Sequence, residues 1–251
     1  MRLYSILALL ALAFLSPLGC SKGGGTVKHG NLSYNVTEVF GAGTSALTLA
    51  EAAGRGDVKA INRQLAADTN IINTVGKFDI TPLWWAAWTE NYEGFSALLD
   101  RGADPNAQRS DGYPVMILIA SRKDSKFLAA ALKHGGDPNL RDKKSGEAPL
   151  CPCITLGYNQ NTDLLLAAKA DVNWQDSISG ETLPVMAIGA RRDYELVYKL
   201  FQNGADPTLK DRFGHTLADV IELASKNASN NDSPWRAKVI EYMRSKGMTV
   251  K

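Results

Sequence analysis

Gly102-Ala103-Asp104-Pro105-Asn106 is one of four copies of a short phrase in this 251-residue chain. The other copies are Gly135-Gly136-Asp137-Pro138-Asn139, Lys169-Ala170-Asp171-Val172-Asn173 and Gly204-Ala205-Asp206-Pro207-Thr208. Their aspartates stand 33, 34 and 35 residues apart. A fixed period of about 20–50 residues is typical of stacked supersecondary units rather than of one globular core. The period therefore favours an extended binding surface over a catalytic pocket.

A second mark, a proline followed by an apolar stretch, falls at a fixed place in each period. The copies are Thr81-Pro82-Leu83-Trp84, Tyr113-Pro114-Val115-Met116, Ala148-Pro149-Leu150-Cys151 and Leu183-Pro184-Val185-Met186, with a weaker His215-Thr216-Leu217-Ala218. Proline suits the first turn of a helix, where its missing N–H has no partner to lose. A second apolar run at helical spacing follows, and in three periods a glycine comes directly after it. Each period is predicted to be helix, tight turn, helix and glycine stop.

The two marks together resemble the ankyrin repeat. Residues 77–106 carry the resemblance best, through Thr81-Pro82-Leu83, Ala86-Ala87, Leu98-Leu99 and Gly102-Ala103-Asp104. The resemblance covers about residues 45–225 and implies an all-α ankyrin-repeat solenoid of about five to six helix-turn-helix repeats. A nonrepeating helical bundle would need both marks to recur in phase by coincidence. The histidine that the family places after Pro-Leu is replaced by Trp84, Met116, Cys151 and Met186.

Residues 1–19 differ from the repeats and read as a secretory signal. Met1-Arg2 supplies a positive charge, residues 3–15 are almost entirely apolar, and Gly19-Cys20 follows. The run resembles a bacterial lipoprotein signal, which implies that Cys20 becomes the lipidated first residue at the periplasmic face of the outer membrane. Pro17 stands where the usual leucine would be, so ordinary cleavage near the same place remains open.

Residues 20–44 are expected to be the lipidated cysteine and a flexible tether, because residues 21–30 are rich in glycine. Residues 31–37 alternate apolar and polar side chains, which predicts a short strand. Residues 45–251 are expected to form the repeat domain, closed by a capping helix that starts at Pro234 after the N-cap Ser233. The lipid would supply the membrane anchor.

Charge and cysteine content exclude several classes of function. The chain has 28 basic and 26 acidic residues, which gives no electrostatic footprint for nucleic acid. Cys151 and Cys153 have no second pair or nearby histidine to complete a zinc site, and on a helix they would point roughly opposite ways. We interpret both as small buried hydrophobes, with an oxidised pair as the alternative.

The sequence contains no recognisable catalytic motif. Its three histidines show no metal-ligand spacing, and neither a Gly-x-Ser-x-Gly elbow nor a phosphate loop occurs. The repeated aspartates are expected to bond their own backbone in turns. We therefore predict that the chain is not an enzyme and has no catalytic, metal or cofactor site.

The resemblance places a concave binding face on the turn tips and on the exposed end of each first helix. Aromatic residues and arginine dominate binding energy at interfaces. Trp84 and Trp85 are expected in the core, whereas Trp88 and Trp174 are expected to be exposed, and Phe78 to lie at a turn tip. The predicted partner-binding residues are Trp88, Thr89, Tyr92, Arg109, Arg122, Lys123, Lys143, Thr155, Tyr158, Trp174, Arg191, Arg192 and Phe213.

The signal, tether and repeats together resemble the periplasmic immunity lipoproteins found beside type VI secretion effectors, especially phospholipase toxins. The resemblance implies a monomer that binds one secreted toxin one-to-one and occludes its active site or its approach to lipid. The alternative is a periplasmic scaffold or chaperone for an envelope enzyme such as an antioxidant enzyme. An enzyme acting on envelope lipid or peptidoglycan ranks below both.

Overall fold

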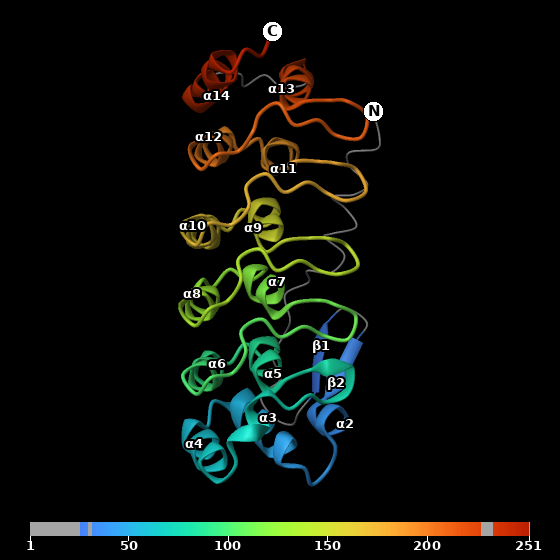
Figure 1. Cartoon of the computed structure of the whole chain (residues 1–251), viewed down its shortest axis with the longest axis vertical. Helices are drawn as coiled ribbons and strands as arrows, with labels where there is room; N and C mark the ends of the chain where they lie inside the picture. Colours follow the sequence, from blue (N-terminus) through green and yellow to red (C-terminus); the bar gives the residue numbers. More distant parts are fainter. Residues whose placement is uncertain (1–25, 30–31, 227–232, 251) are drawn as a thin grey trace. The chain divides into compact units, whose positions relative to one another are not determined.

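The computed structural model describes residues 26–29, 32–226 and 233–250 (Figure 1). The chain divides into two compact units: unit 1 ends at Lys144 and unit 2 begins at Ser145. The predicted signal, residues 1–19, and the predicted lipidation site Cys20 lie outside the described residues. Among the helices that are described, none is both long enough and apolar enough to cross a membrane.

Unit 1 contains three helix pairs preceded by a short N-terminal segment. That segment is an antiparallel hairpin of β1 (Thr26–His29) and β2 (Leu32–Asn35), followed by α2 (Val36–Phe40). The first helices of the pairs are α3 (Ser45–Arg55), α5 (Pro82–Trp88) and α7 (Val115–Ala120). The second helices are α4 (Val58–Ala67), α6 (Tyr92–Leu99) and α8 (Lys126–Lys133). Two 3-10 helices, η1 (Thr69–Asn73) and η2 (Lys77–Asp79), lie between α4 and α5.

Unit 2 contains three further helix pairs in its described residues. Its first helices are α9 (Leu150–Leu156), α11 (Leu183–Arg191) and α13 (Leu217–Lys226). Its second helices are α10 (Asn159–Ala167), α12 (Tyr194–Gln202) and α14 (Pro234–Ser245). The capping helix that the sequence predicts is α14, in which Val239, Ile240 and Met243 are buried.

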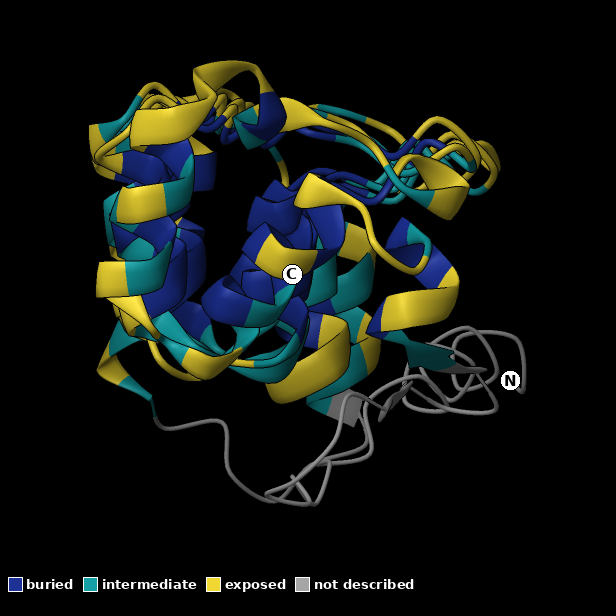
Figure 2. Cartoon of the chain, turned by 90° about the horizontal axis from the view of Figure 1, so that it is seen from below, coloured by how far each residue is buried: buried dark blue, intermediate teal, exposed yellow. Residues whose placement is uncertain are grey.

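Within each unit the first helices form one row and the second helices another (Figure 1). The buried residues lie mainly where the two rows face each other, and the exposed residues lie mainly on the outer sides (Figure 2). The long turns, which join each second helix to the next first helix, project beyond the first-helix row (Figure 1). We call these long turns, together with the side of the first helices that faces them, the inner face of each unit.

The prolines mark helix starts as predicted. Pro82 lies in the first turn of α5, where the Trp84 N–H donates to Thr81 Oγ1 over 3.1 Å. Pro184 lies in the first turn of α11, and Pro114 and Pro149 directly precede α7 and α9. Each proline therefore sits where a helix has no use for its N–H.

The repeated phrase builds a turn and also ties it to the next turn. In unit 1 the Asn106 N–H donates to Asp104 Oδ1 over 2.8 Å, the local bond expected of aspartate in a turn. The Asn106 side chain then accepts from the Asp137 N–H (2.7 Å) and donates to the Gly135 carbonyl (3.1 Å). Asn173 makes the same two bonds to Asp206 and Gly204 in unit 2. The phrase is thus a connector between consecutive repeats.

The core contains the residues that the sequence assigned to it, together with Cys151 and Cys153. Trp84 and Trp85 are 1% and 2% exposed, and Phe95 is 0% exposed. Cys151 and Cys153 are buried, and no disulfide joins them. Burial raises the pKa of the Cys153 thiol to about 12, so it is uncharged at neutral pH. The interpretation of both as buried hydrophobes is confirmed.

The tether prediction is wrong for residues 26–29. These residues form β1, which pairs with β2. The strand predicted within residues 31–37 is shorter and ends at Asn35, because the Asn35 side chain caps α2 by accepting from the Thr37 N–H at 2.9 Å. Residues 26–29 and 32–35 are therefore paired strands that precede α2.

Candidate protein-binding surface

The inner face of unit 1 is covered at α5 by the chain's own N-terminal segment. The Tyr34 ring lies 5.1 Å from the Trp88 ring in an edge-on arrangement and 5.4 Å from the Phe78 ring. Phe40 of α2 lies edge-on to Trp85 at 6.3 Å. Aromatic pairs at these distances are attractive beyond their burial. The end of α5 is therefore closed by β2 and α2.

The predicted exposure of Trp88 is wrong, because Trp88 is 4% exposed. Its ring lies between Tyr34 and the Trp84 ring, which is 4.5 Å away. Position along the repeat correctly indicated the inner face, but it gave no information about the segment that covers this position. Phe78, by contrast, is exposed at its turn as predicted.

The predicted exposure of Trp174 is also wrong. Trp174 is 4% exposed, and its Nε1–H donates to the Gly146 carbonyl over 2.8 Å. The ring therefore joins two consecutive long turns of unit 2, where a polar indole N–H finds a partner as buried tryptophans usually require. Trp174 therefore connects consecutive turns and is not an exposed binding residue.

Two of the predicted arginines are engaged within unit 1. Arg109 forms an ion pair with Asp111, and its guanidinium lies 5.6 Å from the centre of the Trp84 ring. Because Arg109 bonds to Asp111, the pKa of this carboxyl is lowered despite its partial burial. Arg122 pairs with Glu90 and donates from Nη2 to the Trp88 carbonyl over 3.2 Å. Both side chains are half-buried connectors between repeats.

The two predicted tyrosines lie with the second helices. Tyr92 opens α6 and lies edge-on to Phe127 of α8 at 5.5 Å, and Tyr158 is the N-cap residue of α10. The chain reverses before both of them, at Glu90 (φ 59°) and Gly157 (φ 72°). The prediction that they lie on first helices is therefore wrong. Thr89 and Thr155 do end first helices, and each hydroxyl donates to a carbonyl of its own helix.

The remaining predicted residues are exposed. Lys123 and Lys143 are exposed in unit 1, where the base of Lys143 rests on Gly112. In unit 2, Arg191 and Arg192 are exposed at the end of α11, and Phe213 is 69% exposed at a turn tip. The structure thus leaves the exposed predicted residues distributed over both units, and those of unit 2 gather at α11 and the last long turn.

The sequence reasoning missed four residues of the inner faces: Tyr34, Ile178, Glu181 and Gly189. Ile178 is 64% exposed on the turn beside that of Phe213. The Glu181 carboxylate is partly buried, and its pKa is raised to about 6 by that burial and by the charges of Asp176 and Asp211. Gly189 is exposed on α11. An apolar residue at a turn tip was the one available signal, for Ile178.

The side chains of the described residues form no group of three or more histidines, cysteines or acids arranged to hold a metal ion. The aspartates of the phrase instead accept backbone N–H groups in turns, as Asp171 does from Asn173 over 2.9 Å. These surfaces offer groups for binding: apolar turn tips, arginines and one carboxylate.

Comparison with known proteins places this geometry in a family. The Ankyrin repeat family matches residues 78–110. Protein PhlB of Serratia liquefaciens is 34% identical over 152 residues, which are 61% of this chain and 66% of PhlB. PhlB therefore has about a third of its length outside the region that this chain matches.

Solved structures give the same result for the fold. The ankyrin repeat protein EF0377 is 28% identical with a TM-score of 0.65, covering 78% of this chain and 97% of its own. A structure of the predatory endopeptidase Bd0816 from Bdellovibrio bacteriovorus in complex with immunity protein Bd3460 matches with 21% identity and a TM-score of 0.61, over 78% of this chain and 97% of that chain. With the helix pairs and the repeated phrase, these matches show that the chain is an ankyrin-repeat protein with the all-α ankyrin-repeat solenoid fold.

Proposed function

We propose that the chain is a periplasmic ankyrin-repeat lipoprotein that binds a secreted toxin one-to-one and neutralises it by occluding its active site or its approach to lipid. The observation that carries a binding role is the inner face of unit 2. There Phe213 and Ile178 are exposed on adjoining turns, and Arg191 and Arg192 are exposed at the end of α11. Exposed apolar residues and arginines are typical of protein interfaces.

The turns that present these residues are already ordered by hydrogen bonds. The Phe213 N–H donates to Asp211 Oδ1 over 2.8 Å, and the Arg212 N–H donates to the Ser179 carbonyl over 2.9 Å. A surface held in this way loses little conformational entropy when it binds. Such preorganisation suits an inhibitor that must capture its target by simple contact.

One structural neighbour and the usual role of ankyrin-repeat proteins support this choice. Bd3460 is an immunity protein in complex with an endopeptidase, and it shares the fold of this chain. Ankyrin-repeat proteins are typically binding scaffolds without catalysis, which agrees with the described site. The toxin class, an enzyme that degrades lipid, comes from the resemblance to immunity lipoproteins and remains part of the proposal.

The proposed anchor is lipid on Cys20, with the protein held at the periplasmic face of the outer membrane. Labelling cells with radioactive palmitate tests it: Cys20→Ser should abolish label in the protein and leave a soluble or unprocessed species. Ordinary signal cleavage predicts instead the same labelling for Cys20→Ser and for the parent.

Competition between bacterial strains tests the immunity role. A strain that lacks this gene should lose to toxin-delivering sister cells, and the intact gene should restore survival. If the deletion strain survives as well as its parent, the immunity role is wrong, and a scaffold for a resident envelope enzyme becomes the better reading. Purification of the chain with one stoichiometric partner then identifies which enzyme it binds.

A further inference from the structure

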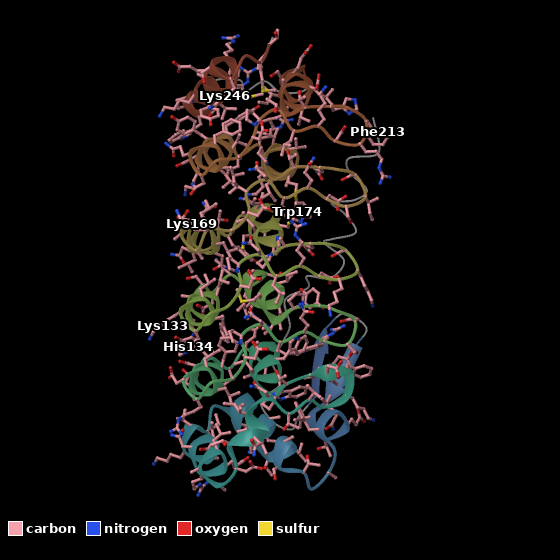
Figure 3. All side chains as sticks on the ribbon, in the orientation of Figure 1. Lys133, His134, Lys169, Trp174, Phe213 and Lys246 are labelled. Carbon is pink, nitrogen blue, oxygen red and sulfur yellow. The ribbon has the colours of Figure 1, made fainter. Side chains whose placement is uncertain are left out.

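Two large apolar side chains of unit 2 stand on adjoining turns. Ile178 and Phe213 are each two residues beyond an aspartate that accepts their N–H, Asp176 at 3.0 Å and Asp211 at 2.8 Å. The turns are joined to each other by the bonds from Arg212 to Ser179 and from Gln175 Nε2 to the Lys210 carbonyl (3.0 Å). Figure 3 shows Phe213 at the outer end of its turn. The tips therefore present a fixed pair of apolar groups.

Glu181 lies where the first of these turns returns to α11, and in the part of the chain that the structure describes no cation forms an ion pair with its carboxylate. Its backbone is satisfied, because the N–H donates to Ser179 Oγ and the carbonyl accepts from Asp176. Within the described residues, no hydrogen bond or ion pair involves the Glu181 carboxylate. The nearby acids Asp176 and Asp211 oppose its charge, and His215 is engaged with Asp211 at 3.0 Å.

Gly189 leaves open space next to that carboxylate. A Cβ added to Gly189 would meet nothing nearer than Glu181 Oε1, at 4.0 Å. In Gly94 of unit 1 the same Cβ would lie 1.9 Å from the Ala53 carbonyl oxygen, so packing within the unit requires that glycine. Glycine inside a helix is destabilising relative to alanine. The described residues of the chain give no packing reason for glycine at position 189.

We propose that Ile178, Glu181, Gly189 and Phe213 form a docking surface for a protein segment that carries an apolar side chain and a lysine or arginine. The apolar side chain contacts the two tips, the cation pairs with Glu181, and Gly189 lets the segment's backbone approach α11. The inference rests on the proposed function as a protein-binding module, and it adds the chemistry of the bound segment. We call these four residues the unit 2 docking patch.

Charge complementarity favours a protein segment over a lipid surface. Glu181, Asp176 and Asp211 bring three carboxylates to the base of the turns, and they repel the phosphate groups of a membrane. A lysine or arginine side chain is long enough to reach Glu181 from a backbone that passes over Gly189. A partly buried carboxylate without a cation is the complement of such a residue.

Selection of random peptides displayed on phage against the full chain tests the docking patch. Enriched peptides should combine an apolar residue with lysine or arginine, and Glu181→Gln should weaken their binding about tenfold or more. Gly189→Gln should also block them, whereas Gly189→Ala should reduce binding far less. The matched control is Val75→Ser, which removes an exposed apolar side chain from a long turn of unit 1 and should leave binding unchanged.

Three results would overturn this inference: no enrichment, enriched peptides without a cation, or equal binding to the parent and to Glu181→Gln. Binding to vesicles of phosphatidylethanolamine and phosphatidylglycerol that is lost in an Ile178→Ser/Phe213→Ser double variant would also contradict it, because the patch would then serve lipid. The competition experiment reports on immunity separately. If the docking patch binds cationic peptides but the chain does not protect cells in the competition experiment, the inference about the patch stands and the proposed toxin partner is wrong.

Discussion

On the inner face of unit 1 Trp88 is covered by Tyr34, whereas on that of unit 2 Ile178 and Phe213 have most of their surface exposed. Both units use the same helix pairs and the same asparagine connector between turns. They differ in what lies over the first helices, since unit 1 has its own N-terminal segment there. Among the described residues, a shared repeat frame thus produces a face that is closed at α5 in unit 1 and a face that is open in unit 2, and the open face is the better candidate for a partner.

The largest expected effect is at Trp88. Trp88→Ala should lower the free energy of unfolding by about 3–5 kcal/mol, because it empties a packed aromatic site. Phe213→Ala should change it by less than about 0.5 kcal/mol, because the side chain is exposed. Urea unfolding followed by the far-ultraviolet circular dichroism of the helices measures both free energies. Equal losses in the two variants would contradict the contrast between a closed and an open face.

The second effect is a pH dependence from Glu181. Its pKa is raised from 4.5 to about 6 in the folded protein, so the folded state holds this proton to higher pH than the unfolded state does. The associated stability is complete below about pH 4.5 and is lost as pH rises through 6, by about 2 kcal/mol at most. Glu181→Gln should remove this loss and be the more stable protein at neutral pH. Denaturation curves of the two proteins, recorded at each pH, measure the difference in their stability. If that difference does not change with pH, the Glu181 carboxylate has a cationic partner and the prediction is wrong.

A third test asks whether the frames of the two units really are alike. Asn106→Ala and Asn173→Ala each remove two hydrogen bonds to the next turn, and each should cost about 1–2 kcal/mol. Thermal unfolding of the two variants should give similar shifts. A cost confined to one unit would mean that the repeat phrase has different roles in the two units.

The smallest effect concerns Gly189. Gly189→Ala should stabilise the protein by about 0.5–1 kcal/mol, because alanine favours the helix and meets open space. Gly94→Ala is the matched control in unit 1 and should destabilise, since its new methyl group would overlap the Ala53 carbonyl. A loss of stability in Gly189→Ala would show that the site is packed, and would remove Gly189 from the docking patch.

Local sequence patterns predicted the helix pairs and turns of this protein, but they did not predict which residues are exposed on its surface. The prolines before α5 and α11 mark helix starts by their own backbone geometry, so their neighbours along the chain suffice. The burial of Trp88 depends on Tyr34, far away in sequence, and that of Trp174 on Gly146. Among the described residues, Glu181 has no cationic partner and Gly189 has no side chain packed against it. A sequence motif does not reveal the absence of a contact. Position in the repeat therefore predicted the face, but not what covers it.

The asparagine connector also determines how such a chain can change in length. The interval from Asn73 to the Asp104 N–H is 31 residues, and that from Asn106 to the Asp137 N–H is again 31. Removing residues 74–106 would place Asn73 where it can accept the Asp137 N–H. Removing half of that stretch would break the hydrogen bond between an asparagine side chain and the aspartate N–H of the next turn. The heritable increment in unit 1 is consequently one whole repeat of 33 residues, and a gene of this kind gains or loses surface in steps of one repeat.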